Sequence, residues 1–545
     1  METTNLSKIK REKMLKTIND IKKNISDEET LNNLSLIENE LTKKKYGLIW
    51  EEHEERVDKE LKTKVPTFTE LKNKKLVSNH DNKFNFILEG DNLHCLYLLE
   101  KTHTEKIDVI YIDPPYNRGT NDFIYDDKYL GEEDEFRHSK WLSFMSKRLK
   151  IAKKLLKNSG CIFISIDDIE YTPLKLLCDE IFGEKFVETY IWCLQDKSEC
   201  SFVKTSGLTV RKEHEYIIAC FKSKKRFNKY RGLREFNDES FSNPDNDPRG
   251  DWFSGNISRN GIKTTTGSKY YEIVTPTGKK YTRNWTLSKE EYNEKLENNE
   301  IYFSKNGDGV PRLKIYRNSN IYLIQSSLFT DCHTSITGKN ELKKLFSGSS
   351  PFDFPKPPSL IKRLIEISSG DDAIILDFFA GSGTTGQAVI ELNNTLGGNR
   401  QFILCTNNEN NICEKITYKR LKKIHLGTDK YEKVPFNLKY YKCKCVPRIN
   451  SEKNNLHDNL LKNIINLIQL ENGMEIDGKK IRIYLHEDDL DKFTMNDSEL
   501  NICEKVYISS DILLTLNQEE KFEENNIEVY IIPEYYFEKE IMEVM

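Results

Sequence analysis

The chain has 545 residues, 31% of them charged and 37% hydrophobic, with a formal net charge of −4 at pH 7. This length predicts about three or four structural units with sizeable cores. The near-neutral balance does not by itself indicate a nucleic-acid-binding protein. The polar start of the chain and the lack of any apolar run of about 18 residues predict neither a secretory signal nor a membrane span.

Cysteine usage indicates a reducing compartment. The twelve cysteines show no CxxC pairing, and Cys443-Lys444-Cys445 has a one-residue gap that is not a typical zinc spacing. We therefore expect a cytoplasmic protein with free thiols and predict no metal site from the sequence.

Charge is distributed unevenly along the chain. Residues 201–350 carry 26 Lys and Arg against 17 Asp and Glu, a net +9, whereas residues 451–545 carry 9 against 22, a net −13. A polyanion is therefore expected to bind the middle of the chain. For the acidic tail, ordinary solvated surface charge is an equally good explanation.

The first elements predict a helical arm followed by an α/β layer. Residues 1–65 are rich in Lys and Glu with helically spaced Leu and Ile, and Pro66 is expected to end this arm. Next come a strand at 84–88, a helix at 93–99, the apolar strand at 107–112 and a helix near 139–158. Gly160 is expected to stop that helix before a strand at 161–166. This alternation predicts a mostly parallel sheet covered by helices.

The regular pattern is then interrupted and resumes. Residues 205–350 are rich in Gly, Asn, Ser, Thr, Tyr and Trp, which predicts an irregular, β-leaning insertion whose aromatic residues mostly form its core. The α/β pattern returns in 351–425, with a helix near 359–368 and strands at 373–376 and 401–405. Residues 426–545 are expected to form a separate acidic α/β segment. The sheet is thus divided between 66–204 and 351–425.

The turn after the 107–112 strand carries the sequence Asp113-Pro114-Pro115-Tyr116. The carboxyl end of a strand is where ligands bind in open α/β sheets. Two prolines fix φ twice and so hold the carboxylate and the aromatic ring at a set separation. Such a turn suits a flat ring that bears an amine, although a plain strand-ending Pro-Pro turn is the alternative.

A second motif, Asp377-Phe378-Phe379-Ala380-Gly381-Ser382-Gly383-Thr384-Thr385-Gly386, follows one predicted strand and opens a helix. Its glycines satisfy G-x-G-x-x-G, a pattern that lets the backbone approach a ligand next to the free N–H groups of a helix start. No Lys-Ser/Thr pair follows, so a P-loop is disfavoured. Glu409, after the next strand, is placed to accept ribose hydroxyls. The motif favours an adenosine-containing cofactor over a plain glycine-rich turn.

Together the two motifs resemble those of the β-class amino-methyltransferases that act on DNA, and specifically the modification subunit of Type III restriction–modification systems. The resemblance covers about 45–425, and more weakly the tail, and it keeps the order of catalytic motif, insertion and cofactor motif. Gly90-Asp91-Asn92 resembles the cofactor-side loop of the family. Phe354-Pro355-Lys356-Pro357 resembles its segment near the methionine end of the cofactor.

The resemblance implies a Rossmann-like S-adenosylmethionine-dependent methyltransferase sheet, circularly ordered and interrupted by a target-recognition insertion. It makes 66–204 the catalytic half, 205–350 the DNA-binding insertion, 351–425 the cofactor half and 426–545 a segment for dimer or partner contact. It assigns catalysis to Asp113, Pro114, Pro115 and Tyr116. Asp113 and the Pro114 carbonyl would accept the N–H bonds of the amine, and Tyr116 would stack on the base. For the cofactor, Asp91 is assigned to the adenine, Glu409 to the ribose, Lys356 to the carboxylate, and Asp377, Phe379, Ala380, Gly381, Gly383 and Thr384 to the methionine moiety.

Plainer roles stay open for two of these residues, since Asp91 also suits a helix N-cap and Lys356 an ordinary surface position. The expected partners are double-stranded DNA, a second copy of the chain and a restriction (helicase/endonuclease) subunit, in a nucleoid-associated protein. The expected reaction methylates N6 of a flipped-out adenine. The rivals are a cytosine-N4 enzyme, disfavoured by the leading Asp113, an RNA or protein methyltransferase, and a DNA-binding subunit without activity.

Overall fold

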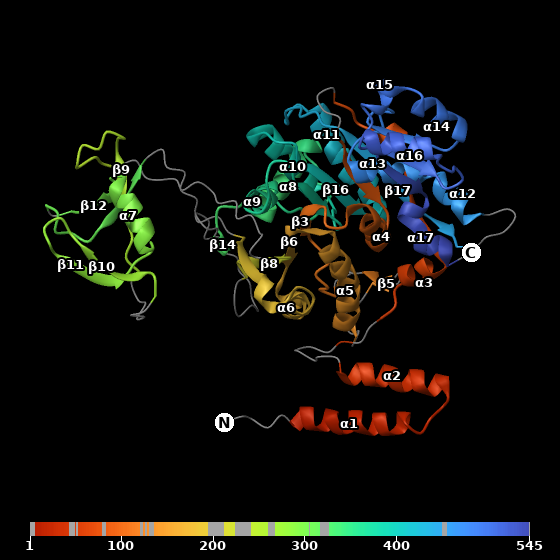
Figure 1. Cartoon of the computed structure of the whole chain (residues 1–545), viewed down its shortest axis with the longest axis horizontal. Helices are drawn as coiled ribbons and strands as arrows, with labels where there is room; N and C mark the ends of the chain where they lie inside the picture. The colour runs from red at the N-terminus through yellow and green to blue at the C-terminus, as the bar shows by residue number, and fades with distance from the viewer. Residues whose placement is uncertain are drawn as a thin grey trace. The chain divides into compact units, whose positions relative to one another are not determined.

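The fold is given by a computed structural model (Figure 1), which describes residues 6–42, 50, 53–78, 83–119, 124–125, 128–129, 136–194, 212–223, 241–259, 267–304, 306–316, 326–448 and 455–543. The chain divides into two compact units, one made of residues 1–228 and 326–545 and the other of residues 229–325. No helix within these described ranges combines the length and apolar character that crossing a membrane requires.

The larger unit is built on one ten-stranded sheet. Its strands lie in the order β1-β17-β2-β16-β15-β3-β6-β8-β7-β14. The pairs from β17 to β6 are parallel, whereas β8 runs antiparallel to both of its neighbours and β1 runs antiparallel to β17. The strands are β1 (Lys64–Glu70), β2 (Asn85–Glu89), β3 (Ile107–Ile112), β6 (Leu156–Ile166), β7 (Val187–Cys193), β8 (His214–Phe221), β14 (Leu328–Phe329), β15 (Ile374–Asp377), β16 (Gln401–Thr406) and β17 (Leu438–Pro447).

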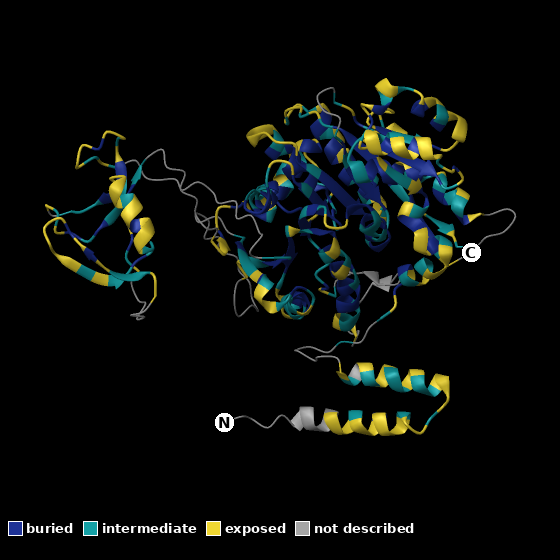
Figure 2. Ribbon diagram, in the orientation of Figure 1, coloured by how far each residue is buried: buried dark blue, intermediate teal, exposed yellow. Residues whose placement is uncertain are grey.

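Helices cover both faces of this sheet, and the central strands are buried on each side (Figure 2). Alternate residues of β3 enter opposite cores, with Ile110 and Ile112 in one and Val109 and Tyr111 in the other. This explains why the strand is a continuous apolar run, and the arrangement confirms the predicted α/β class with a mostly parallel centre. The covering helices are α3 (Arg56–Thr63), α4 (Asn92–His103), α5 (Arg137–Leu155), α6 (Asp168–Phe182), α8 (Ser335–Leu345), α9 (Pro358–Glu366), α10 (Thr384–Leu396) and α11 (Lys419–Leu426).

The acidic carboxyl-terminal segment both joins the main sheet and builds a small one. Its β17 lies between β1 and β2, and the whole segment belongs to the larger unit. The small sheet is parallel, in the order β18-β19-β20. Its elements are α12 (Leu456–Leu461), α13 (Ile464–Asn472), β18 (Ile481–Tyr484), α14 (Glu487–Thr494), α15 (Asp497–Leu500), β19 (Lys505–Ser509), α16 (Leu516–Glu524), β20 (Glu528–Ile532) and α17 (Glu534–Met542).

The smaller unit is β-rich, as its composition indicates, and lies within the predicted insertion. β8 and α8, which flank it inside residues 205–350, belong to the larger unit. Trp252 and Trp285 are buried, and Trp285 packs in its core with Ile273 and Tyr292. Its elements are β9 (Trp252–Asn256), β10 (Tyr270–Val274), β11 (Lys280–Asn284), α7 (Lys289–Glu297), β12 (Ile301–Tyr302) and β13 (Arg312–Tyr316).

The amino-terminal arm begins with a helical hairpin. Its two helices are joined by a short turn, and Lys22 at the end of the first bonds Glu38 on the second at 2.6 Å. The predicted helix end at Pro66 differs from the structure, because β1 already begins at Lys64. Pro66 therefore lies within β1. This strand is at the edge of the sheet, where the missing N–H of a proline is tolerated. The hairpin helices are α1 (Leu6–Lys22) and α2 (Glu28–Thr42). The remaining short elements are the strands β4 (Ile124–Tyr125) and β5 (Lys128–Tyr129), the 3-10 helices Lys72–Lys74, Glu184–Phe186 and Glu409–Asn411, and the π-helix Ile412–Tyr418.

The predicted role of Gly160 as a helix stop is wrong. α5 ends at Leu155, and Gly160 lies inside β6. A Cβ added at Gly160 would lie 2.9 Å from the carbonyl oxygen of Ile107 and 3.0 Å from that of Asp108. The glycine is therefore needed for the close approach of β6 to β3 rather than for breaking the helix.

We predict that Gly160→Ala lowers the free energy of unfolding by about 1–3 kcal/mol, because the added methyl group forces two backbone carbonyls apart. Denaturant unfolding followed by circular dichroism measures this loss. Asn158→Ala, at an exposed position of the same strand, is the matched control and should change stability little. Equal stability of Gly160→Ala and the parent chain would contradict the packing described.

Candidate active site at the carboxyl ends of the central strands

The candidate site lies where the direction of the chain through the sheet reverses. β15 and β3 are adjacent and parallel, but the chain continues from β15 to β16 on one side and from β3 to β6 on the other. Ligands bind at such a switch point, outside the carboxyl ends of the strands. The four adjacent strands β2, β16, β15 and β3 bring the segments with Asp91, Glu409, Asp377 and Asp113 to this one edge.

Lys356 is the centre of the polar contacts at Asp113. Its Nζ donates to both carboxylate oxygens of Asp113, at 2.8 and 3.0 Å, and to the Tyr116 hydroxyl at 2.8 Å. The side chain of Lys356 is 8% exposed, compared with 28% for Asp113. The surface-lysine alternative therefore does not hold. The assignment of Lys356 to a cofactor carboxylate remains a prediction, and in this structure its ammonium group is bound to Asp113.

Glu215, at the start of β8, completes the cluster and was not recognised in the sequence. Its Oε2 lies 3.0 Å from the Tyr116 hydroxyl and 3.5 Å from Lys356 Nζ. The hydroxyl also lies 3.0 Å from Asp113 Oδ1, and since it has one proton it donates to one carboxylate at a time. Two carboxylates facing one ammonium leave the cluster with one net negative charge.

The charges in the cluster fix its protonation state. Burial alone would lower the pKa of Lys356, but the charges of Asp113 and Glu215 outweigh it and raise the pKa above the usual value. Burial, together with the same two carboxylates, raises the pKa of Tyr116 well above its usual value. At neutral pH the site therefore contains an ammonium group and a neutral phenol.

Hydrogen bonds from α5 and from the residue after Tyr116 fix the Asp-Pro-Pro-Tyr turn. Trp141 Nε1 donates to the carbonyl of Pro115 at 2.7 Å. Asn117 is buried with a left-handed φ of 58°, and its side-chain amide donates to Glu170 at 2.5 Å. The two prolines are thus followed by an anchored residue, which fixes where Tyr116 lies.

The second motif forms a compact turn between β15 and α10. Asp377 is buried, its Oδ1 accepts from the backbone N–H of Phe379 at 3.0 Å, and its Oδ2 accepts from Thr385 Oγ1 at 2.5 Å. Gly381 and Gly383 have positive φ values of 48° and 79°, which favour glycine. Burial raises the pKa of Asp377 to about 7.

A buried arginine fixes the shape of the glycine turn. Arg420, in α11, donates to Ser382 Oγ at 3.0 Å, to Thr384 Oγ1 at 2.8 Å and to Gln387 at 2.8 Å. The Thr417 hydroxyl donates to the Gly381 carbonyl at 2.6 Å. The turn is therefore held in one conformation before any ligand arrives.

The Gly90-Asp91-Asn92 turn lies beside the glycine motif. Asp91 caps α4 by accepting from Leu93 N at 2.8 Å, which is the capping role the sequence left open. Asn92 donates to the Phe378 carbonyl at 3.0 Å and accepts from the buried Arg148 at 2.6 Å. Arg148 in turn pairs with both oxygens of Glu55 at 3.0 Å.

The remaining predicted residues fall around these two turns. Phe379 is half-buried and packs against Phe144, with ring centroids 5.8 Å apart, while Ala380 and Thr384 are buried. Glu409 is exposed at the first residue of the short turn after β16. Glu215, Arg148 and Arg420 were not among the residues predicted from the sequence. For the two arginines, the available signal was a charged residue within an apolar pattern, which does not reveal its partner.

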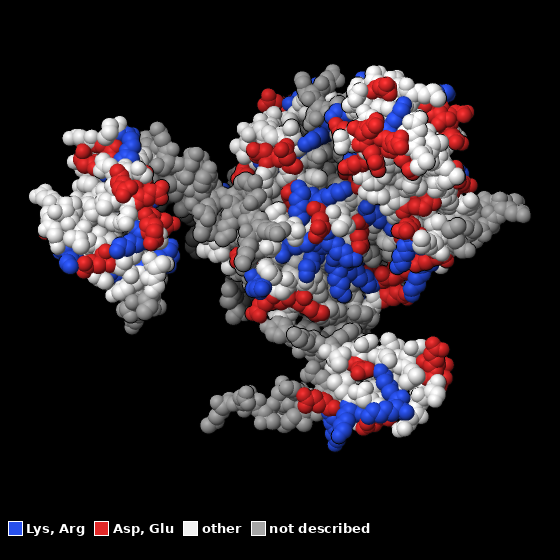
Figure 3. All heavy atoms as spheres, in the orientation of Figure 1, with Lys and Arg blue, Asp and Glu red and all other residues white. Residues whose placement is uncertain are grey.

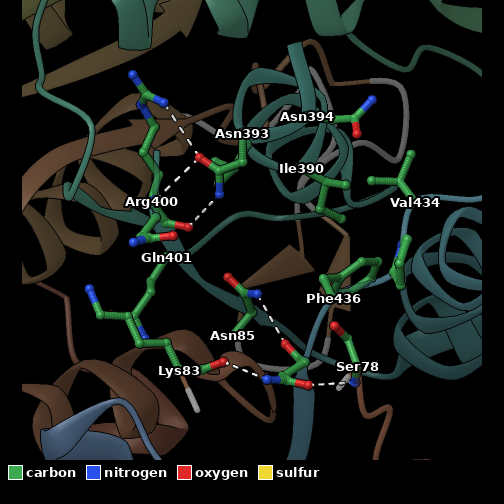
Figure 4. Close-up of a pocket in the computed structure, with 14 residues that line it drawn as sticks. Ser78, Lys83, Asn85, Ile390, Asn393, Asn394, Arg400, Gln401, Val434 and Phe436 are labelled. Carbon is green, nitrogen blue, oxygen red and sulfur yellow. Dashed lines mark hydrogen bonds between the residues drawn. The ribbon is translucent and has the colours of Figure 1, made fainter. Parts of the chain in front are cut away.

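A separate pocket opens at the opposite, amino-terminal end of the strands (Figure 4). It is lined by Asn85 and Gln401, the first residues of β2 and β16, and by Asn393, Arg400 and Asn437. Its amide groups already bind backbone: Asn393 pairs with the main chain of Arg400, and Asn437 accepts from Ser78 N and donates to the Lys83 carbonyl. This pocket is therefore not the predicted site.

Comparison with known proteins agrees with this geometry. The sequence model of a DNA methylase family matches residues 107–419. The chain is 36% identical to the Type III restriction–modification enzyme StyLTI Mod subunit of Salmonella typhimurium, over 64% of this chain and 57% of that protein. It is 34% identical to the Type II methyltransferase M.KpnI of Klebsiella pneumoniae, over 64% of this chain and 86% of that one.

Another relative is the EcoP15I Mod subunit of Escherichia coli, 31% identical over 59% of this chain and 58% of that subunit. The matches thus span somewhat more than half the length of the two Mod subunits. Among solved structures, the PvuII DNA methyltransferase (cytosine-N4-specific) has a TM-score of 0.33 and 14% sequence identity, and the match covers 63% of this chain and 93% of that chain.

We predict that Asp377→Asn reduces the pH dependence of stability. A carboxyl whose folded pKa is raised from about 4 to about 7 stabilises the fold at low pH and loses that contribution as pH rises through 7. Each tenfold change in proton affinity corresponds to about 1.4 kcal/mol. When the pH is raised from 5 to 8, the free energy of unfolding should therefore fall less in the variant than in the parent chain, and the two decreases should differ by a few kcal/mol. Parallel pH profiles would show that Asp377 has an ordinary proton affinity.

Proposed function

Because the chain belongs to this family of DNA methylases, we propose that it is a site-specific methyltransferase that transfers a methyl group from S-adenosylmethionine to N6 of adenine in DNA. We further propose that it is the modification subunit of a Type III restriction–modification system, cytoplasmic and nucleoid-associated, working as a dimer with a restriction subunit. The observation that carries the proposal is the Asp113–Lys356–Tyr116–Glu215 cluster beside the glycine turn, at the switch point of the sheet.

The residues at this edge fit the proposed cofactor. Asp91 and Glu409, at the ends of β2 and β16, offer carboxylates for hydroxyl and amine groups, and the half-buried Phe379 offers a ring face. The start of α10 offers backbone N–H groups to a carboxylate. S-adenosylmethionine supplies, when bound, a methyl group on a positively charged sulfur. The net negative charge of the Asp113–Glu215–Lys356 cluster favours such a cation.

Asp113 would hold the amine that is methylated. The lone pair of the adenine amine is delocalised into the ring, which makes the amine a poor nucleophile. When Asp113 and the Pro114 carbonyl accept its two N–H bonds, the nitrogen can turn its lone pair out of the ring plane, and positioning does most of the catalysis. Once the nitrogen is methylated, Asp113 is placed to take the released proton and, being 28% exposed, to pass it to water.

Tyr116 would hold the base itself, which has to leave the duplex to reach the pocket. Stacking on an aromatic ring contributes about 1–3 kcal/mol. The ring is already fixed, since its hydroxyl bonds Lys356 and Glu215 and the Arg118 guanidinium lies 5.0 Å from its centroid. Lys356 would therefore serve first to hold Asp113 and Tyr116 in place.

DNA would contact two regions of the chain. Residues 205–350, with their excess of basic residues, are proposed as the target-recognition insertion. On the larger unit, Lys and Arg side chains gather over the region of α5, whereas Asp and Glu gather over the carboxyl-terminal helices (Figure 3). A basic surface of this kind suits the phosphate backbone.

We predict that Asp113→Ala abolishes DNA methylation by this chain, with a loss of at least about 10²–10³-fold, because the amine loses its charged acceptor. Single-molecule sequencing of DNA from a methylation-free host measures it. Recurrent N6-methyladenine at one sequence is expected with the parent chain and with Asp372→Ala, an exposed control. N4-methylcytosine instead would establish the cytosine rival. A folded, cofactor-binding protein that modifies no DNA base would refute the proposal and leave RNA and protein as substrates to test.

We predict that Glu215→Gln slows methyl transfer about 10- to 100-fold while leaving cofactor affinity nearly unchanged, since a hydrogen bond to a charged group contributes about 1.5–3 kcal/mol. Single-turnover rates and calorimetric cofactor binding separate the two effects. Glu188→Gln, at an exposed position of the neighbouring β7, is the control. A parallel loss of rate in both variants would argue against a positioning role for Glu215.

A further inference from the structure

Three side chains of metal-ligand type meet beside the β17 strand, away from the Asp113 cluster. They are Glu60 of α3, His94 of α4 and Cys445 of β17, and one potential ligand atom from each lies within 4.8 Å of the others. Cys445 Sγ is 4.0 Å from the His94 ring nitrogens, and His94 Nε2 is 3.7 Å from Glu60 Oε2. Sequence spacing could not indicate this cluster, because its members are up to 385 positions apart.

These separations are close to those of a tetrahedral zinc site. With Zn–S of about 2.3 Å and Zn–N or Zn–O of about 2.0–2.1 Å, neighbouring ligand atoms lie about 3.3–3.6 Å apart. The distances from His94 to Cys445 and to Glu60 exceed this by less than about half an ångström, and the Cys445–Glu60 separation is within 4.8 Å. Small side-chain rotations would therefore bring all three atoms within bonding distance of one ion.

His94 is the residue that most needs an explanation. It is 6% exposed, and the polar contacts found for its ring among the described residues are the long ones to Cys445 and Glu60. Buried polar groups usually have good hydrogen-bond partners. A neutral imidazole ring has a nitrogen lone pair that it can donate to a metal ion.

The charges and ligand types select the class of ion. A thiolate and a carboxylate supply two negative charges, which a divalent ion balances. Two basic residues, Arg56 on α3 and Lys64 on β1, also face this cluster. Sulfur and imidazole ligands favour zinc-like ions over Mg²⁺ or Ca²⁺. We propose that Glu60, His94 and Cys445 bind one Zn²⁺ ion, with water as the fourth ligand, and so join α3, α4 and β17.

Binding has a defined proton balance. A cysteine thiol without a stabilising cation is protonated near neutral pH, whereas the thiolate is the form that binds a metal ion. On binding, the S–H proton is released to water, a sulfur–zinc bond forms, and no electron is transferred. The ion would stabilise the folded state in proportion to its concentration relative to the dissociation constant.

The test uses Co²⁺ as a spectroscopic substitute for Zn²⁺ on the chelator-treated full-length chain. We expect one equivalent of Co²⁺ to bind with a thiolate-to-metal charge-transfer band, and Zn²⁺ to displace it. Cys445→Ser and His94→Gln should abolish the band. Cys193→Ser, a half-buried thiol at the end of β7, and His103→Gln, a buried histidine on the same helix α4, are matched controls and should retain it.

Two further measurements keep the test decisive if a ligand variant folds poorly. Glu60→Gln should retain the band but bind Co²⁺ at least about tenfold more weakly. Zinc should raise the thermal midpoint of the parent chain and of Cys193→Ser, but not that of Cys445→Ser. Absence of a thiolate band in the parent chain, or an unchanged band in Cys445→Ser, would overturn the proposal.

Discussion

The ammonium group of Lys356 binds Asp113, which lies 243 positions earlier in the sequence, and the geometry of the candidate active site depends on this contact. A buried ammonium is costly unless several partners replace its water. Here Asp113 and Tyr116, in the turn after β3, and Glu215, in β8, take the place of that water. The hydrogen bonds that stabilise the buried Lys356 therefore also set the positions of the Asp113 carboxylate and the Tyr116 ring, which the proposed chemistry needs.

Two buried arginines perform the corresponding task for the cofactor side. Arg420 holds the glycine turn by its side-chain hydroxyls, and Arg148 holds Asn92, which reaches the carbonyl of Phe378. Planar guanidinium groups with several donors suit this role, since one residue can fix several loop atoms at once. The turns at the ends of β2 and β15 are thereby held relative to one another without a contribution from the ligand.

The central strands and both turn motifs could be predicted from the sequence, whereas most of their contacts could not. β3 is recognisable because burial on both faces demands a continuous apolar run, and the positions of Asp113 and Asp377 follow from strand ends. The α5–β6 boundary was misjudged because Gly160 signals a helix end locally, while its actual cause is the carbonyls of β3. Glu215 could not be foreseen for a similar reason: its partner Tyr116 is 99 positions away, and nothing in the local pattern of β8 records that contact.

The strand order also determines how late in synthesis the central sheet can be completed. In the sheet β2 and β3 are separated by β16 and β15, which follow them in the chain by nearly three hundred residues, and β17 then fills the position between β1 and β2. On the ribosome, the edges of β2 and β3 that face each other therefore have no native neighbour until the inserted unit has been completed. Pairings of such long separation form slowly and leave strand edges open to other chains. The interval between synthesis of β3 and of β15 is thus the period in which the nascent protein most needs protection from aggregation.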